Sequence, residues 1–170
     1  PAIARTVGIE LPIKGMVLSV GVLERPPELH GPHPACIDAA NGIYFRPEVG
    51  NLTLLGFSSV VDRLDSPENL DPDSYPSEPG MDWSVRTSTR LASRIPGMAD
   101  ARWLRAWSGV DGDTPDGHLI LDKAPGVEGL YLAVGMSGTG FKVAPAVGMC
   151  MAELVIQGVA TTTNIRPFRL

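Results

Sequence analysis

The residues best placed for chemistry lie in the segment GLYLAVGMSGTGFKVAPAVG, residues 129–148. Gly135, Gly138 and Gly140 put bare backbone at one turn, and Lys142 adds a positive charge directly after it. A helix that begins at such a turn presents unpaired N–H groups and the positive end of its dipole, so the turn predicts a site for negative charge. The alternative is that the glycines serve only a sharp bend and close strand–helix packing.

Two common phosphate-binding motifs do not match this turn. No Gly-Lys-Ser/Thr follows the glycines, and they do not form G-x-G-x-x-G with a downstream acidic residue. Lys142 precedes an otherwise apolar segment, so we expect its side chain to be partly enclosed and to have a partner. The alternatives are a side chain that reaches solvent, or an ion pair with Asp116 or Glu128.

Other residue types that often perform chemistry give no site. Cys36 and Cys150 have neither metal-ligand spacing nor the density of a disulfide scaffold, so we expect no metal, reduced thiols and a cytoplasmic location. His118 in TPDGH is expected to hold a loop, and His30 and His33 lie in a loop rich in Pro and Gly. We therefore predict no catalytic side chain.

Composition limits the class of protein. The chain has 170 residues, 44% of them hydrophobic and 19% charged, which is enough for one substantial core. A net charge of −5 with scattered Lys and Arg argues against nucleic acid or an anionic membrane as a partner. The most apolar region is interrupted by glycines, Pro145 and Lys142, so no membrane span is expected. The chain starts without Met in an extended segment, as a piece of a larger protein would.

Strands are expected to dominate the first two thirds of the chain. The predicted strands share aliphatic, β-branched or alternating residues: 13–23, 42–48, 52–57 and 101–110. Gly50-Asn51 predicts a tight hairpin between the second and the third. The acidic segment 61–80 contains four prolines and predicts a solvated surface loop.

Helices are expected in two places. Residues 83–95 predict a helix with Asp82 as its N-cap and Pro96-Gly97 as its end. Residues 130–134 predict a strand covered on both faces, and helical spacing then predicts a helix over 144–158 with Pro145 in its first turn. The expected fold class is α+β with an α/β-like C-terminal end: a mostly antiparallel sheet with flanking helices, then a strand, a turn and a helix.

The segment RAWSGVDGDTPDGHLILDKAPGVEGLYLAVGMSGTGFKVAPAVGMCMAELVIQG resembles the C-terminal part of FAD-dependent amine oxidoreductases. This is the family of D-amino-acid oxidase, glycine oxidase, sarcosine oxidase and dimethylglycine dehydrogenase. The hairpin NGIYFRPE…LTLLGF, the segment LASRIPGMADA and the terminal RPFRL are also similar, so the resemblance covers nearly the whole chain. It implies that residues 1–112 are part of a substrate-binding domain with an antiparallel sheet. Residues 113–170 would be the C-terminal segment of the FAD-binding, dinucleotide-binding domain.

The resemblance also implies where the flavin lies. Strand 130–134 would deliver the turn to the isoalloxazine ring, and the helix start would stabilise negative charge on the reduced ring. The implied cofactor-binding residues are Gly135, Met136, Ser137, Gly138, Thr139, Gly140, Phe141 and Lys142. Gly109 stands where some sarcosine oxidases have a flavin-tethering cysteine, which implies non-covalent FAD.

The substrate assignment follows from further correspondences. Lys142 matches a lysine in GFK that holds the substrate carboxylate in relatives that oxidise N-methylated glycines. Glycine oxidases use an arginine in GLRP, where this chain has Val110-Asp111. Tyr44 resembles an aromatic residue that closes the substrate cavity, with ordinary sheet packing as the alternative. Thr139 and Ser58 replace family histidines, which leaves the exact amine open.

The chain is therefore expected to be a C-terminal fragment of a flavin-dependent oxidoreductase. That enzyme would oxidise the C–N bond of a small amino acid or a sarcosine- or dimethylglycine-like amine, as an oxidase or a dehydrogenase. The N-terminal glycine fingerprint does not occur in the 170 residues, so the fragment alone should be inactive and bind FAD incompletely or not at all. Its partners would be the missing N-terminal FAD-binding segment and, through exposed apolar faces, other copies of itself. The alternative is a non-catalytic carboxylate-binding module or structural subunit.

Overall fold

The computed structural model describes residues 1–67 and 70–170, without the side chains of residues 59, 63 and 64. The chain forms two compact units, each described below by itself. Unit 1 comprises Pro1–Gly15 and Asp111–Leu170, and unit 2 comprises Met16–Val110. The C-terminal boundary lies within two residues of the expected division after residue 112. Residues 1–15, however, pack with the C-terminal segment, because Ala4 and Leu11 share an apolar cluster with Leu132.

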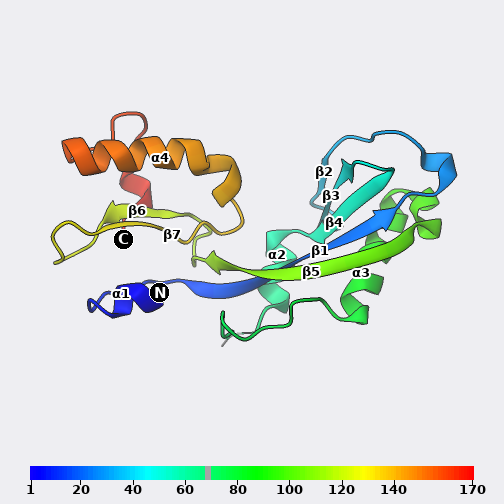
Figure 1. Cartoon of the computed structure of the whole chain (residues 1–170), viewed down its shortest axis with the longest axis horizontal. Coiled ribbons are helices and arrows are strands. Elements are labelled where there is room, and N and C mark those ends of the chain that lie inside the picture. Colours follow the sequence, from blue (N-terminus) through cyan, green and yellow to red (C-terminus); the bar gives the residue numbers. More distant parts are fainter. Residues whose placement is uncertain (68–69) are drawn as a thin grey trace. The chain divides into compact units, whose positions relative to one another are not determined.

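Unit 2 is built on a five-stranded antiparallel sheet with the strand order β2-β3-β4-β1-β5 (Figure 1). The strands are β1 (Lys14–Glu24), β2 (Cys36–Asp38), β3 (Ile43–Glu48), β4 (Leu52–Phe57) and β5 (Arg102–Asp113), of which β1 and β5 continue into unit 1. The predicted hairpin is confirmed, since Ile43 pairs with Phe57 and Glu48 with Leu52. Gly50 and Asn51 turn it with φ of 78° and 63°. The short edge strand β2 was not predicted.

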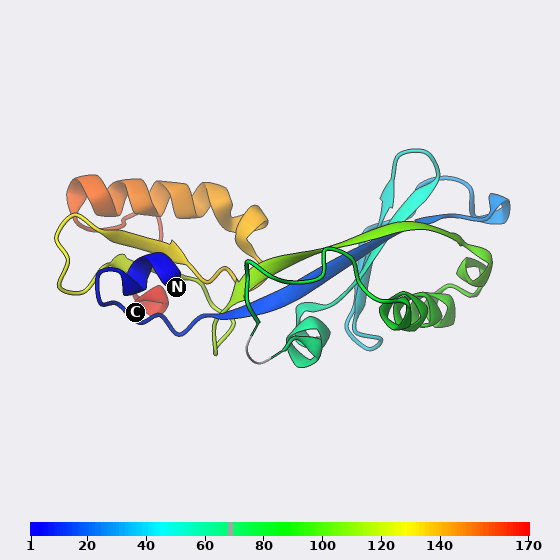
Figure 2. The ribbon, with the colours of Figure 1, turned by 60° about the horizontal axis from the view of Figure 1, so that its bottom comes forward.

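Helix α3 (Met81–Arg94) covers one face of this sheet, as Figure 2 shows. Its buried Trp83 and Leu91 join a core with Leu23, Leu55 and Phe57. The helix ends before Pro96 as predicted, and the short helix η2 (Pro96–Asp100) follows. The predicted N-cap was wrong: Gly80 is the N-cap, and Asp82 lies in the first turn, where it pairs with Arg86 at 3.0 Å.

The segment 61–80 is not a loop throughout. Its first residues belong to helix α2 (Ser59–Asp65), which starts after Ser58 and ends at Ser66, whose amide donates to the Asp62 carbonyl at 2.9 Å. Residues 68 and 69 lie outside the described residues. The remaining described part of the segment, up to Gly80, contains no regular element, in agreement with the prediction for that part.

Unit 1 is a two-stranded antiparallel ribbon with a helix along it. Strands β6 (Ile120–Lys123) and β7 (Tyr131–Val134) pair in register from Ile120 opposite Val134 to Lys123 opposite Tyr131. Helix α4 (Gly140–Gln157) packs on one face through Cys150 and Leu154, which contact Leu121. The other face carries Leu132, which contacts helix α1 (Ala2–Arg5) in the N-terminal segment that was expected to be extended. Strand β7 was predicted and β6 was not.

The start of α4 differs from the prediction. The helix begins at Gly140, four residues earlier than expected, with Thr139 as its N-cap. Pro145 therefore lies in the second turn, where its missing N–H leaves the Phe141 carbonyl without a helical donor.

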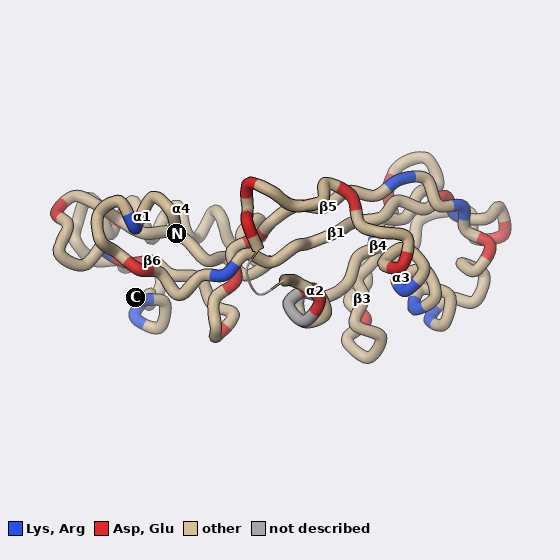
Figure 3. The backbone as a smooth tube through the Cα atoms, turned by 90° about the horizontal axis from the view of Figure 1, so that it is seen from below, with Lys and Arg blue, Asp and Glu red and all other residues tan. Residues whose placement is uncertain are grey.

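The charged residues of the two units are mixed in sign along the backbone (Figure 3). Helix α3 carries three arginines at four-residue spacing, Arg86, Arg90 and Arg94, and two of them form ion pairs with acidic residues. Arg86 pairs with Asp65 at 2.7 Å, and Arg94 pairs with Asp38 at 3.4 Å.

Candidate functional site

The turn between β7 and α4 is the candidate site, and its backbone requires glycine at two positions. Gly135 and Gly138 have φ of 66° and 79°, and Ser137 between them has φ of 48°. A Cβ on Gly135 would lie 2.5 Å from Cγ2 of Thr114. The bend and the close approach of Thr114 thus account for Gly135 without a ligand, as the alternative reading of the sequence proposed.

A buried pair of hydroxyl groups fixes this turn. The Thr114 amide donates to Oγ of Ser137 at 3.1 Å, and the two hydroxyl oxygens lie 3.0 Å apart. The Thr114 hydroxyl donates to the His118 carbonyl at 2.6 Å. The Ser137 amide donates to the Gly112 carbonyl at 3.0 Å. Thr114 and Ser137 are 2% and 5% exposed, so this network sets the path of the chain into α4.

Asp111 holds the turn from the end of β5. One carboxylate oxygen accepts from the Gly112 amide at 2.8 Å, and the other accepts from the Gly138 amide. The Thr139 hydroxyl donates back to the Met136 carbonyl at 2.6 Å. Asp111 was noted in the sequence only as a replacement for an arginine. Its structural role could not be found from sequence because its partner lies 27 residues away.

The first three residues of α4 carry the features that could meet an anion. Gly140, Phe141 and Lys142 are the first helical residues, whose N–H groups have no acceptor within the helix. The Phe141 side chain is 100% exposed and Lys142 is also exposed. The expectation of a partly enclosed lysine was wrong for this chain. In the described part of the chain, Lys142 makes no ion pair with Asp116 or Glu128, and the side chain reaches solvent.

Tyr44 lies on β3 in unit 2, directly opposite Gly56 of β4. Its ring covers that glycine so closely that a Cβ on Gly56 would lie 2.6 Å from the ring. Burial raises the pKa of the Tyr44 hydroxyl, and the negative charge of Asp62 adds to the shift. The packing accounts for the position of Tyr44 within the sheet.

Asp62 of α2 is a titratable residue that the sequence did not single out. It is only 4% exposed. Burial, together with the nearby charge of Asp65, raises its pKa to about 7. The sequence placed Asp62 in a solvated loop, and only the helix that forms there buries it.

The predicted flavin-binding residues lie together in the structure. Residues 135–142 are consecutive and lie at one turn of unit 1, whereas Tyr44 belongs to unit 2. No group of three or more metal-ligating side chains occurs among the described residues, and no metal was predicted.

Helix α4 is apolar on its outer side as well as on its packed side. Phe141, Met149 and Ile156 are exposed, Ile156 by 81%. Over its 18 residues the helix is long and apolar enough to cross a membrane by length and composition alone, a test that core helices of soluble proteins also meet. The expectation that glycines, Pro145 and Lys142 would interrupt the segment was wrong, since the helix is continuous through the proline and the lysine.

Comparison with known proteins identifies the family. The profile of the DAO family, described as FAD dependent oxidoreductase, matches residues 2–154. The chain belongs to this family. FAD-dependent oxidoreductase domain-containing protein 1 of Bos taurus is 35% identical over 130 residues, which cover 75% of this chain and 26% of that protein.

Two further relatives are bacterial. Glycine oxidase of Geobacillus kaustophilus is 29% identical over 132 residues, covering 78% of this chain and 32% of that protein. Sarcosine oxidase subunit beta of Rhizobium meliloti is 39% identical over 69 residues, covering 41% of this chain and 16% of that protein. The aligned part of the chain thus covers a third or less of the length of these relatives.

The fold of the DAO family is present as well. The crystal structure of the Geobacillus kaustophilus glycine oxidase superposes with a TM-score of 0.77 at 24% identity, covering 98% of this chain and 41% of that one. The predicted α+β fold class, with its mostly antiparallel sheet, is confirmed.

Proposed function

We propose that this chain is the C-terminal part of a flavin-dependent oxidoreductase that oxidises the C–N bond of a small amine. The substrate would be an amino acid or an N-methylated glycine of the sarcosine or dimethylglycine type. One observation carries the proposal: in a member of the DAO family, α4 presents three free N–H groups and an exposed Lys142 at the turn that the family resemblance assigns to the flavin.

The residues of the turn fit the negatively charged edge of a reduced flavin. The unpaired N–H groups of Gly140, Phe141 and Lys142 are donors, and the positive end of α4 favours negative charge there. Asp111 already accepts from Gly138, so that N–H group is occupied within the protein. Gly109 offers no thiol, which supports non-covalent binding.

The chain's own residues would act by binding and orienting. When bound, the flavin accepts a hydride equivalent from the substrate C–H bond next to nitrogen. Lys142 would pair with the substrate carboxylate, a role open to it because its side chain has no ion pair among the described residues. Tyr44 would border the substrate. Asp111 stands where a glycine oxidase has its arginine. Its side chain is negatively charged and accepts from two amides, so Asp111 does not replace that arginine as a partner of the substrate carboxylate.

The remaining cofactor contacts would come from outside these residues. The chain has no dinucleotide-binding glycine fingerprint and covers less than half of each of the compared relatives. We expect the outer face of α4 to pack against the rest of the FAD-binding domain rather than against lipid, in a cytoplasmic protein. The chain alone should then bind FAD incompletely or not at all and should self-associate through that face.

The test uses Lys142→Met in the complete flavoprotein, with Lys123→Met as a control on another exposed lysine. We expect the flavin absorption to persist and kcat/KM for sarcosine to fall about tenfold to hundredfold, since a charge-assisted hydrogen bond is worth about 1.5 to 3 kcal/mol. Amines without a carboxylate should react with nearly unchanged kcat/KM, and the control should behave like the parent.

Two results would contradict the proposal. Loss of flavin in the variant would make Lys142 a cofactor ligand rather than a substrate ligand. A complete protein that binds carboxylates but shows no flavin reduction by any amine under anaerobic conditions would favour the non-catalytic carboxylate-binding module.

A further inference from the structure

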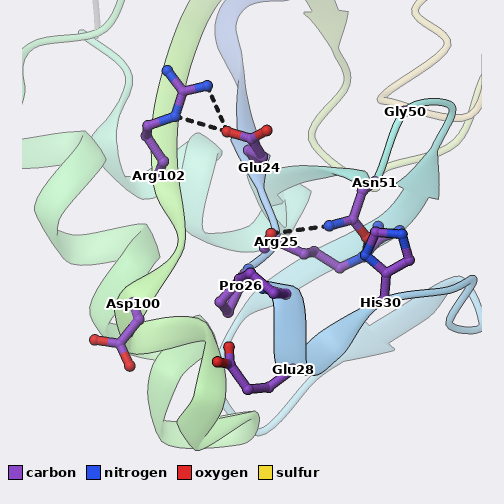
Figure 4. A pocket seen from close by; sticks show the side chains of 10 residues that line it. Glu24, Arg25, Pro26, Glu28, His30, Gly50, Asn51, Asp100 and Arg102 are labelled. Carbon is purple, nitrogen blue, oxygen red and sulfur yellow. Dashed lines mark hydrogen bonds and ion pairs between the residues drawn. The ribbon is translucent and has the colours of Figure 1, made fainter.

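Unit 2 contains an open hollow of about 920 Å³ whose lining residues include none of those proposed for flavin or substrate. It lies where the end of β1, the hairpin turn after β3 and the short helices η1 (Pro27–Leu29) and η2 come together (Figure 4). The charged and polar lining residues are Glu24, Arg25, Glu28, His30, Asn51, Asp100 and Arg102. Charge is therefore concentrated in a small concave surface.

Arg25 is the central residue of the hollow. It is 6% exposed, yet it has no carboxylate partner in the part of the chain that the structure describes. Its Nε donates to Oδ1 of Asn51 at 3.1 Å and to the Leu29 carbonyl at 3.3 Å. Its Nη1 donates to Oγ1 of Thr53 at 3.1 Å and to the Leu52 carbonyl. All four acceptors are neutral, so the buried positive charge is not compensated.

The other terminal nitrogen of Arg25, Nη2, has no acceptor among the described residues. Arg25 is one of the residues that line the hollow. Figure 4 shows the Arg25 side chain lying beside Asn51 and His30, both of which line the hollow. Both N–H groups of this nitrogen remain available for charge-assisted hydrogen bonds to an anion such as a carboxylate.

The guanidinium is held rigidly. Asn51 returns a hydrogen bond from Nδ2 to the Arg25 carbonyl at 3.0 Å, and the Arg25 amide donates to the Asn51 carbonyl at 3.0 Å. Oγ1 of Thr53, which accepts from Arg25, lies 2.9 Å from Nε2 of His33. The donor pair is therefore preorganised, which lowers the entropy cost of binding an anion.

The acidic residues of the hollow decide the class of ligand. Glu24 is neutralised by Arg102, with N–O distances of 2.5 and 2.7 Å. Glu28 and Asp100 are exposed and have no cationic partner among the described residues. Two free carboxylates would repel a dianion such as phosphate but would attract an ammonium group.

We propose that this hollow binds a small zwitterion, with its carboxylate on Arg25 and its ammonium group near Glu28 and Asp100. A ligand of this class compensates the buried guanidinium and at least one of the free carboxylates at once. The site is independent of the proposed oxidation, because it needs neither flavin nor the turn before α4.

The experiment titrates the complete protein, with its flavin, by isothermal calorimetry and amide NMR. The probes are β-alanine, 4-aminobutanoate and 5-aminopentanoate, which separate the two charges by increasing lengths. Butanoate, butylamine and inorganic phosphate are the single-charge and dianion controls. We expect at least one zwitterion to bind about tenfold or more tightly than any control and to shift the amide signals of Asn51 and His30.

Variants assign the charges. Arg25→Gln should abolish binding of the zwitterion. The double variant Glu28→Gln/Asp100→Asn changes exposed residues and so keeps the fold. It should weaken zwitterion binding about tenfold and should strengthen butanoate binding, because the two repelling carboxylates are gone. The matched control Asp71→Asn/Glu78→Gln removes two exposed carboxylates of unit 2 outside the hollow and should bind like the parent.

Several outcomes would overturn the proposal. Equal binding of butanoate and the zwitterions, preference for phosphate, or no binding of any probe would each do so. An unchanged affinity of the double variant Glu28→Gln/Asp100→Asn for the zwitterion would also overturn the proposal. This test does not depend on whether Arg25→Gln folds. None of these results would affect the amine oxidation proposed above, which is read from flavin reduction.

Discussion

Asp62→Asn should stabilise the protein at alkaline pH, because burial of the Asp62 carboxyl group disfavours its charged form. In the folded chain its pKa is raised to about 7, against 3.8 for an unperturbed aspartate. Below pH 3.8 the carboxyl group is protonated in both states. Between pH 3.8 and 7 the unfolded chain loses the proton while the folded chain keeps it, so stability falls as pH rises, and above pH 7 the loss is constant.

The size of the effect follows from the shift. About three pKa units at 1.36 kcal/mol per unit give an upper limit of about 4 kcal/mol. Helix α2 has only seven residues and can open locally to hydrate the carboxylate, so we expect about half of that limit, about 2 kcal/mol, at pH 8. At pH 5 the gain should be less than half as large.

Urea unfolding followed by tryptophan fluorescence measures the free energy of unfolding at pH 5 and pH 8. The fluorescence reports unfolding of unit 2 because Trp83 and Trp103 lie in contact with its core. Asp73→Asn, at an exposed position of the same unit, is the control and should change stability equally little at both pH values. The reasoning is refuted if Asp62→Asn destabilises the protein at pH 8, or if its stability varies between pH 5 and 8 as steeply as that of the parent.

Three further substitutions probe the packing and the turn. Gly21→Ala should cost about 1 to 3 kcal/mol in urea unfolding, because the new Cβ would lie 2.3 Å from the Trp103 ring, which is packed against the core. Thr114→Val should cost about 1 to 3 kcal/mol and speed amide exchange at Ser137, since it removes a buried hydroxyl from the turn network. Glu153 accepts from Thr161 and Thr162, which lowers its pKa to about 2. Glu153→Gln should therefore lower the thermal midpoint above pH 4.5, with the difference vanishing as pH falls toward 2.

The elements predicted from sequence were those that local patterns specify. The hairpin was predicted from Gly50-Asn51, whose positive φ values suit a two-residue turn between aliphatic runs. The end of α3 was predicted from Pro96, which cannot continue a helix. In the candidate site, the location of the turn was predicted from the glycines, and its free N–H groups followed from the helix after it.

The elements that sequence missed depend on contacts between distant residues. Helix α1 is only four residues long, and it packs through Ala4 against Leu132, more than a hundred residues away. The start of α4 was misplaced because Pro145 was assigned to the first turn, whereas Asp111 and Thr139 set the start earlier. The burial of Asp62 was also missed, because it depends on contacts with distant residues. An acidic stretch rich in proline carries no local sign of burial.

The position of Pro145 has a consequence for the dynamics of α4. The first turn includes a long bond of 3.4 Å from the Val143 amide to the Thr139 carbonyl, and Pro145 then leaves the Phe141 carbonyl without a helical donor. The rest of the helix is anchored separately, by Cys150 and Leu154 in the core of unit 1. The turn from Gly140 to Ala144 is therefore held by fewer helical bonds than the rest of α4, so its amides should exchange with solvent faster than those around Cys150 and Leu154. The N–H groups proposed to meet the flavin lie in this turn. Binding of an anion there should order the turn, and slower hydrogen exchange of its amides would measure that ordering.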